Sequence, residues 1–207
     1  MKLYLIRHGE SIANASSVIQ PVGSELSEKG KEQARFLAKR FQGIPVDIIL
    51  SSPLARTKQT AEAIQKEIGK EIVYSDLLAE RKQPSELIGK PTEDSEAQRA
   101  FNLWREHAGD PAWHYSDEEN FSEVRARARR FLEFLSQRNE EHILCVTHGV
   151  FLRTLVGLMG FGEQFTPQVF LVLRGFLRTK NTGITVCEQD AEGEWHMETW
   201  NDHAHLG

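Results

Sequence analysis

The chain has 207 residues, enough for one compact domain, and its formal net charge of −5 disfavours a general affinity for nucleic acid or for an anionic membrane. No basic and apolar leader stands at residues 1–10, and no apolar run is long enough to cross a bilayer. Cys145 and Cys187 lie in apolar, strand-like runs, which indicates neither a disulfide framework nor a thiolate metal site. We therefore expect a soluble, cytoplasmic protein.

A short apolar run near the N-terminus, Leu3–Ile6, ends at a charged pair. The run is too short for a stable isolated helix and suits a strand that is buried on both faces. Arg7 and His8 follow it, and open α/β sheets bind ligands at the carboxyl ends of their strands. At Gly9 the missing side chain is expected to let a ligand approach the backbone closely. One histidine after one strand is more often structural than catalytic, so the rest of the chain has to decide.

The second predicted strand, Val46–Leu50, also ends abruptly at polar residues. Ser52 suits a helix N-cap and Pro53 suits the first helical position, which predicts a helix that runs to about residue 68. Arg56 then falls in the first turn of this helix. Free backbone N–H groups and the helix dipole already favour an anion there.

A third strand-like segment, Ile72–Tyr74, precedes Glu80, and the sequence then changes character. Residues 81–120 are polar, contain three prolines and scatter aromatic residues among charges. We interpret this stretch as an insertion that caps the site, with one helix near residues 93–107. The acidic run Asp117–Glu119 is expected to be solvated.

The fourth predicted strand, Ile143–Val146, repeats the pattern of the first, because it ends in Thr147, His148 and Gly149. Helices are predicted at residues 27–41, 121–138 and 150–159, and a hairpin at the end of the chain, at residues 184–200. This alternation predicts one α/β domain over residues 1–207, with a doubly wound, mostly parallel sheet and helices on both faces. Residues 81–120 form its helical or irregular cap insertion.

The polar side chains that follow these strands have complementary chemistry. If the strands are parallel, Arg7, His8, Arg56, Glu80 and His148 meet at one edge of the sheet. Two arginines offer planar sets of donors for phosphoryl or carboxylate oxygens. An imidazole beside them can attack a bound phosphate, and the second histidine can donate a hydrogen bond to the transferring group. Glu80 can supply the proton that the leaving group needs.

Each of these residues also has a structural explanation when it is taken singly. Arg56 could be a helix-surface charge, Glu80 an ion-pair partner of Arg81, and His148 a satisfied core histidine. A metal site is the other chemical interpretation, but H-x-x-x-H and H-E-x-x-H spacings do not occur, and two central arginines would repel a cation. A phosphate-binding P-loop is absent from the sequence as well. We therefore expect no metal and no cofactor.

Four short motifs are distributed along most of the chain. They are Arg7–Glu10 with Ser11 and Asn14 (R-H-G-E-S-x-x-N), Leu26–Gly30 (L-[ST]-x-x-G), Ser51–Thr57 (S-S-P-x-x-R-[TA]) and Val146–Gly149 (V-[ST]-H-G). In this order they resemble the signature of the histidine phosphatase superfamily, the phosphoglycerate mutase-like proteins. The resemblance implies that His8 is transiently phosphorylated and that the phosphoryl group is held by Arg7, Arg56, His148 and Asn14.

The resemblance extends to the proton donor and to the rim of the site. Leu78–Arg81 is similar to the L-x-E-R segment of the mutase branch, which implies that Glu80 is the proton donor. Lys82–Ser85 departs from the tyrosine- and glycine-containing continuation of that branch. Asn181–Ile184 is similar to the superfamily's N-x-x-[IVL] segment, and the predicted substrate-binding residues are Ser11, Asn14, Gly149 and Asn181.

The sequence thus predicts a metal-independent phosphomonoesterase that acts on a small organic phosphate through a phosphohistidine intermediate. The changed segment after Glu80 and the short chain favour a phosphatase over a bisphosphoglycerate-dependent phosphoglycerate mutase, which is the first alternative. The alternative from another class is a phosphate-binding regulatory module without turnover. We expect a small-molecule partner, no nucleic acid and no membrane, and the sequence leaves a homodimer open.

Overall fold

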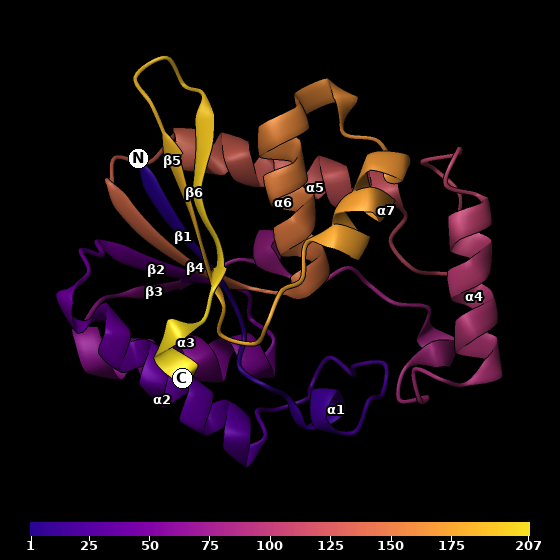
Figure 1. The fold of residues 1–207 in the computed structure, drawn as a ribbon, viewed down its shortest axis with the longest axis horizontal. Coiled ribbons are helices and arrows are strands. Elements are labelled where there is room, and N and C mark those ends of the chain that lie inside the picture. Colours follow the sequence, from indigo (N-terminus) through magenta and orange to yellow (C-terminus); the bar gives the residue numbers. More distant parts are fainter.

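The computed structural model describes residues 1–207, and its centre is a six-stranded sheet with the strand order β3-β2-β4-β1-β5-β6 (Figure 1). The strands are β1 Lys2–Arg7, β2 Ile48–Ser51, β3 Ile72–Tyr74, β4 His142–Thr147, β5 Ile184–Gln189 and β6 Trp195–Asp202. Strands β1 to β4 are parallel, whereas β5 runs antiparallel to β1 and β6 antiparallel to β5. The predicted mostly parallel α/β sheet with a terminal hairpin is confirmed.

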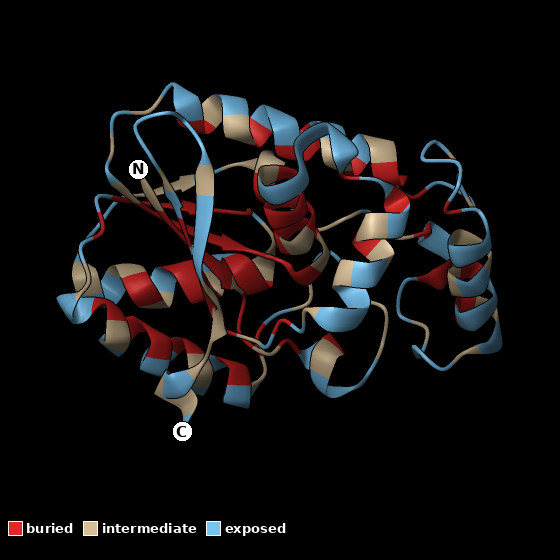
Figure 2. Cartoon of the chain, turned by 45° about the horizontal axis from the view of Figure 1, so that its top comes forward, coloured by how far each residue is buried: buried red, intermediate tan, exposed pale blue.

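Four long helices cover the two faces of the sheet. Helices α2 (Glu28–Arg40) and α3 (Ala55–Ile68) lie on one face, and α5 (Phe121–Ser136) and α6 (Gly149–Phe161) lie on the other (Figure 1). The alternation of side chains along β1 explains the two layers. Leu3 and Leu5 belong to the core beneath α5 and α6, while Tyr4 and Ile6 belong to the core beneath α2 and α3. The central strands β1, β2 and β4 and the inward faces of the helices are buried (Figure 2).

The start of α3 differs from the prediction. The helix begins at Ala55, and its N-cap residue, Leu54, makes no side-chain capping bond. The predicted cap, Ser52, is fully buried, and its hydroxyl lies 2.9 Å from Nε2 of His148. The Ser52 hydroxyl therefore pairs with His148, the residue after β4, and does not cap α3. Arg56 still lies in the first turn of α3, as predicted.

The polar segment 81–120 lies away from the sheet. It contains α4 (Ser95–Glu106), which confirms the helix predicted near residues 93–107 and stands at the far side of α7 in Figure 1. Helix α7 (Pro167–Phe176) was not predicted; it contacts α4 through the edge-to-face rings of Trp104 and Phe170. The expectation that Glu118 is solvated is wrong, because only 3% of this residue is exposed.

The remaining helical elements are short. They are α1 (Ile12–Ala15) and the single 3-10 turns η1 Phe41–Gly43, η2 Asp76–Leu78, η3 Ser85–Leu87, η4 Gly162–Gln164 and η5 Ala204–Leu206. None of the helices combines the length and the apolar character that a bilayer-crossing span requires.

Candidate active site

The two histidines of the motifs lie side by side because their strands are neighbours. Arg7 pairs with Thr147 in the register of β1 and β4, so His8 and His148 both come one residue after matched strand ends. The backbone N–H of His8 donates to the carbonyl of Thr147 at 3.0 Å. The ring centroids are 5.2 Å apart, and both residues are almost completely buried.

The His8 imidazole keeps its Nε2 unprotonated. Its Nδ1 lies 2.7 Å from the carbonyl oxygen of Gly9, and because a carbonyl can only accept, Nδ1 carries the proton. Nε2 accepts from Nε of Arg56 at 3.3 Å. Burial lowers the pKa of His8 well below its ordinary 6.5, and the charges of Arg7 and Arg56 lower it further. His8 is therefore neutral at pH 7, the form in which a histidine acts as a nucleophile.

Several buried polar atoms around His8 have no hydrogen-bond partner within the protein. They are Nε of Arg7, Nδ1 of His148 and the hydroxyl of Thr179. Arg7 is fixed in place because its Nη1 donates to the carbonyl of Thr179 at 2.7 Å. An unsatisfied buried polar group costs about 1–3 kcal/mol, and an anion that accepts from these donors would remove the cost. The cluster has the composition of an anion site.

His148 lies among the same cations. Burial lowers the pKa of His148 well below 6.5, and Arg56, His8 and Arg7 lower it further. Its Nε2 is paired with Ser52, so Nδ1 is the ring atom left for a ligand. Gly149 follows, and a side chain there would lie 3.3 Å from the Thr179 hydroxyl and 3.6 Å from Nε of Arg7. The absence of a side chain at Gly149 thus keeps space beside these donors.

Glu80 is held at the start of α6, one turn from His148. Its carboxylate accepts from the backbone N–H groups of Val150 at 3.2 Å and Phe151 at 3.1 Å, and from that of Arg81 at 3.0 Å. The first N–H groups of a helix have no partner inside the helix, and Glu80 satisfies two of them. The carboxylate is thereby fixed in orientation, close enough to Arg56 to oppose the lowering of that arginine's pKa by burial.

Asparagine and serine side chains support the loop after β1. Asn181 donates from Nδ2 to the carbonyl of His8 at 2.9 Å and to Oδ1 of Asn14 at 3.3 Å. Ser11 and Asn14 form a capping box on the single turn α1, and the Ser11 hydroxyl also donates to Gln20 at 3.1 Å. Asn14 and Asn181 therefore lie next to His8, whereas the Ser11 hydroxyl is occupied within its own loop. Their roles toward substrate stay predictions.

Gly9 has a different neighbour from the one expected. A Cβ at Gly9 would lie 2.6 Å from the carbonyl oxygen of Gly30, and a Cβ at Gly30 would lie 1.9 Å from that of Glu10. The first turn of α2 thus packs directly on the backbone that follows His8. The expectation that Gly9 makes room for a ligand is wrong; these two glycines make room for each other's backbone.

Sequence reasoning missed Thr179. It lies in the loop between α7 and β5, and no local pattern marks it. Its position beside Arg7 depends on β5 returning to pair with β1, a contact between segments that are distant in sequence.

Comparison with known proteins assigns the chain to a protein superfamily. The model of the histidine phosphatase superfamily (branch 1) matches residues 3–203. The chain belongs to this superfamily. The prediction of an enzyme of the histidine phosphatase type is confirmed at that level, with the mutase alternative still open.

The similar proteins include both a protein named as a mutase and a phosphatase. A Photorhabdus laumondii protein named "Probable phosphoglycerate mutase GpmB" is 35% identical, over 100% of this chain and 95% of its own length. Bacillus stearothermophilus YhfR has a similar structure, with a TM-score of 0.84 and 27% identity over 100% of this chain and 99% of that one. A mutant of Entamoeba histolytica phosphoserine phosphatase, in complex with phosphoserine, has a TM-score of 0.80 and 26% identity over 100% of this chain and 99% of that one.

Proposed function

We propose that this member of the superfamily is a metal-independent phosphomonoesterase that acts on a small organic phosphate. One observation carries the proposal: a neutral, buried imidazole has its Nε2 lone pair beside Arg56 and beside buried donors that have no partner. Such a cluster binds a phosphoryl group and places a nucleophile against it.

The proposed reaction has two displacements at phosphorus. In the first, which starts from the protonated form of Glu80, Nε2 of His8 attacks, the bond from phosphorus to the ester oxygen breaks, and the Glu80 carboxyl gives that oxygen its proton and becomes a carboxylate. The negative charge on the phosphoryl oxygens is stabilised by donors from Arg7, Arg56 and His148. In the second, water attacks phosphohistidine, Glu80 takes the water's proton, and inorganic phosphate leaves with His8 neutral again.

The second candidate function is a phosphoglycerate mutase, and the 35% identity to the mutase-named Photorhabdus protein favours it. A mutase would return the phosphoryl group of His8 to a bound sugar acid instead of to water. Against it stands the segment Lys82–Ser85, which differs from the mutase pattern immediately after Glu80.

Product analysis distinguishes the candidates. The protein is incubated, with chelator present, with para-nitrophenyl phosphate or with 3-phosphoglycerate after priming with bisphosphoglycerate. Release of inorganic phosphate from both is expected. Conversion of 3-phosphoglycerate to its isomer without net release would establish the mutase. Neither activity, together with tight binding of phosphate, would establish the binding module.

A further inference from the structure

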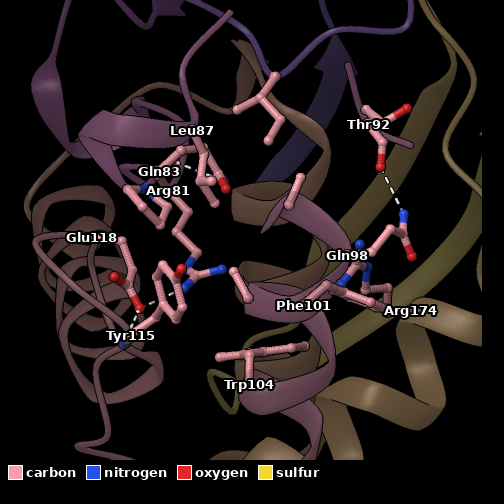
Figure 3. A pocket seen from close by; sticks show the side chains of 14 residues that line it. Arg81, Gln83, Leu87, Thr92, Gln98, Phe101, Trp104, Tyr115, Glu118 and Arg174 are labelled. Carbon is pink, nitrogen blue, oxygen red and sulfur yellow. Dashed lines mark hydrogen bonds and ion pairs between the residues drawn. The ribbon is translucent and has the colours of Figure 1, made fainter. Parts of the chain in front are cut away.

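A cavity of about 290 Å³ lies between the 81–120 segment and α7 (Figure 3). Its walls combine aromatic rings, those of Phe101, Trp104 and Tyr115, with the guanidinium groups of Arg81 and Arg174. Arg81, which lines the cavity, directly follows Glu80 in the chain, so the cavity wall continues the backbone that carries Glu80.

The two arginines of the cavity, Arg81 and Arg174, differ in whether an acidic side chain balances their charge. Arg81 lies 3.7 Å from the buried carboxylate of Glu118, and its Nε donates to the carbonyl of Glu119 at 2.7 Å. The Glu118 carboxylate accepts hydrogen bonds from the backbone N–H groups of Tyr115 and Ser116. The charge of Arg81 is thus balanced within the protein.

Arg174 has no such acidic partner. Its guanidinium lies over the ring of Phe101, 4.4 Å from the centroid, and 5.8 Å from that of Trp104. The side chain makes no hydrogen bond and no ion pair. The rings hold the planar group by its face, which leaves its N–H edge for a ligand. Figure 3 shows Arg174 and Phe101 together at one side of the cavity.

Arg153 connects the end of α7, which carries Arg174, to the candidate active site. Arg153 lies on α6 and donates to the carbonyl of Gly149 at 2.9 Å. Its Nε also donates to the carbonyl of Leu177, three residues after Arg174, at 2.8 Å. The end of α7 is thus joined through Arg153 to Gly149, the glycine beside the unpartnered donors.

We propose that the preferred substrate carries a second anionic group on the part that leaves, and that Arg174 binds this group while His8 takes the phosphoryl group. The second group is a carboxylate or a second phosphate, both of which fit the free edge of a guanidinium. This inference rests on the proposed phosphatase function and adds the substrate class to it.

A matched three-carbon series tests the substrate class. The substrates are glycerol 3-phosphate, 3-phosphoglycerate and glycerol 1,3-bisphosphate, whose far ends carry a hydroxyl, a carboxylate and a phosphate. We expect kcat/KM to be about tenfold or more higher for at least one anionic substrate than for glycerol 3-phosphate, mainly through KM. Which anionic substrate is preferred identifies the second group.

Variants assign the preference to Arg174. In Arg174→Gln the ratio of kcat/KM between the anionic and the neutral substrate falls to near one, and Arg174→Lys, which keeps the charge, retains part of it. Arg99→Gln, an equal charge change on the exposed side of α4, keeps the full ratio. An unchanged ratio in Arg174→Gln, or no preference in the wild type, would overturn the inference while leaving the phosphatase intact. Absence of phosphate release from every substrate, para-nitrophenyl phosphate included, would overturn both.

Discussion

At the scale of single residues, the candidate site depends on which ring atom of His8 is left free. The Gly9 carbonyl fixes the proton on Nδ1, so that Nε2 stands as an acceptor between Arg56 and the unpartnered donors. A histidine held in this tautomer by the backbone of the next residue keeps its other ring nitrogen unprotonated for attack. Glu80, fixed by three N–H donors, is positioned independently of that nucleophile.

The role of Glu80 predicts a dependence on the leaving group. Glu80→Gln cannot donate the proton, so we expect kcat to fall about 10²-fold or more for an alkyl phosphate. It should fall far less for para-nitrophenyl phosphate, whose leaving oxygen needs little protonation. Initial rates over a series of leaving groups measure this. Equal losses across the series would contradict the assignment of Glu80 as the acid.

The two buried histidines predict that stability falls in mild acid. Their folded pKa values lie below the unfolded value of about 6.5, so the unfolded chain binds more protons below that pH. The free energy of unfolding should be steady above pH 6.5 and decline as the pH falls below it, by up to about 1.4 kcal/mol per pH unit for each histidine.

Urea titrations between pH 5 and 8 measure this decline. His148→Gln should show a shallower decline than the wild type. The exposed His196, whose pKa is raised by its hydrogen bond to Asp190, provides the control, because its effect has the opposite sign. His196→Gln should therefore not flatten the curve. An equal slope in wild type and His148→Gln would show that this histidine is not buried in its neutral form.

At the scale of elements, the site is built where α2 packs onto the loop after β1. A serine cap starts α2, and the third residue of the helix, Gly30, lies against the backbone of Gly9 and Glu10. The L-[ST]-x-x-G motif therefore combines a helix start with a close backbone contact. The contact fixes the residues that immediately follow His8.

Gly30→Ala tests this contact. The added Cβ would meet the Glu10 carbonyl oxygen at 1.9 Å, so the helix and the loop have to separate. We expect a loss of about 3 kcal/mol in the free energy of unfolding, together with lower activity, because the loop carries His8. Gly43→Ala is the control, since nothing lies within 4 Å of its Cβ position. Equal stability of the two variants would refute the close contact.

At the scale of the whole molecule, the sequence predicted the order of strands and helices and the strand ends that meet. It did so because apolar runs, caps and turn residues act locally, and a parallel sheet then gathers the strand ends at one edge. Helix α7 was overlooked although Thr166 and Pro167 are a recognisable helix start. Thr179 and Ser52 were missed or misassigned because their partners come from distant segments, which no local pattern reveals. Glu118 accepts from two nearby N–H groups, but the arginine that it faces, Arg81, is also distant in sequence.

The most direct test of the central claim is to trap the phosphoryl group on His8. Wild type and His8→Ala are mixed with labelled phosphate ester in the presence of chelator, quenched in alkali within milliseconds, and mapped by mass spectrometry. We predict an alkali-stable, acid-labile phosphoryl group on His8 of the wild type, and neither label nor phosphate release in His8→Ala. Turnover without any labelled histidine, or full activity in His8→Ala, would contradict the account.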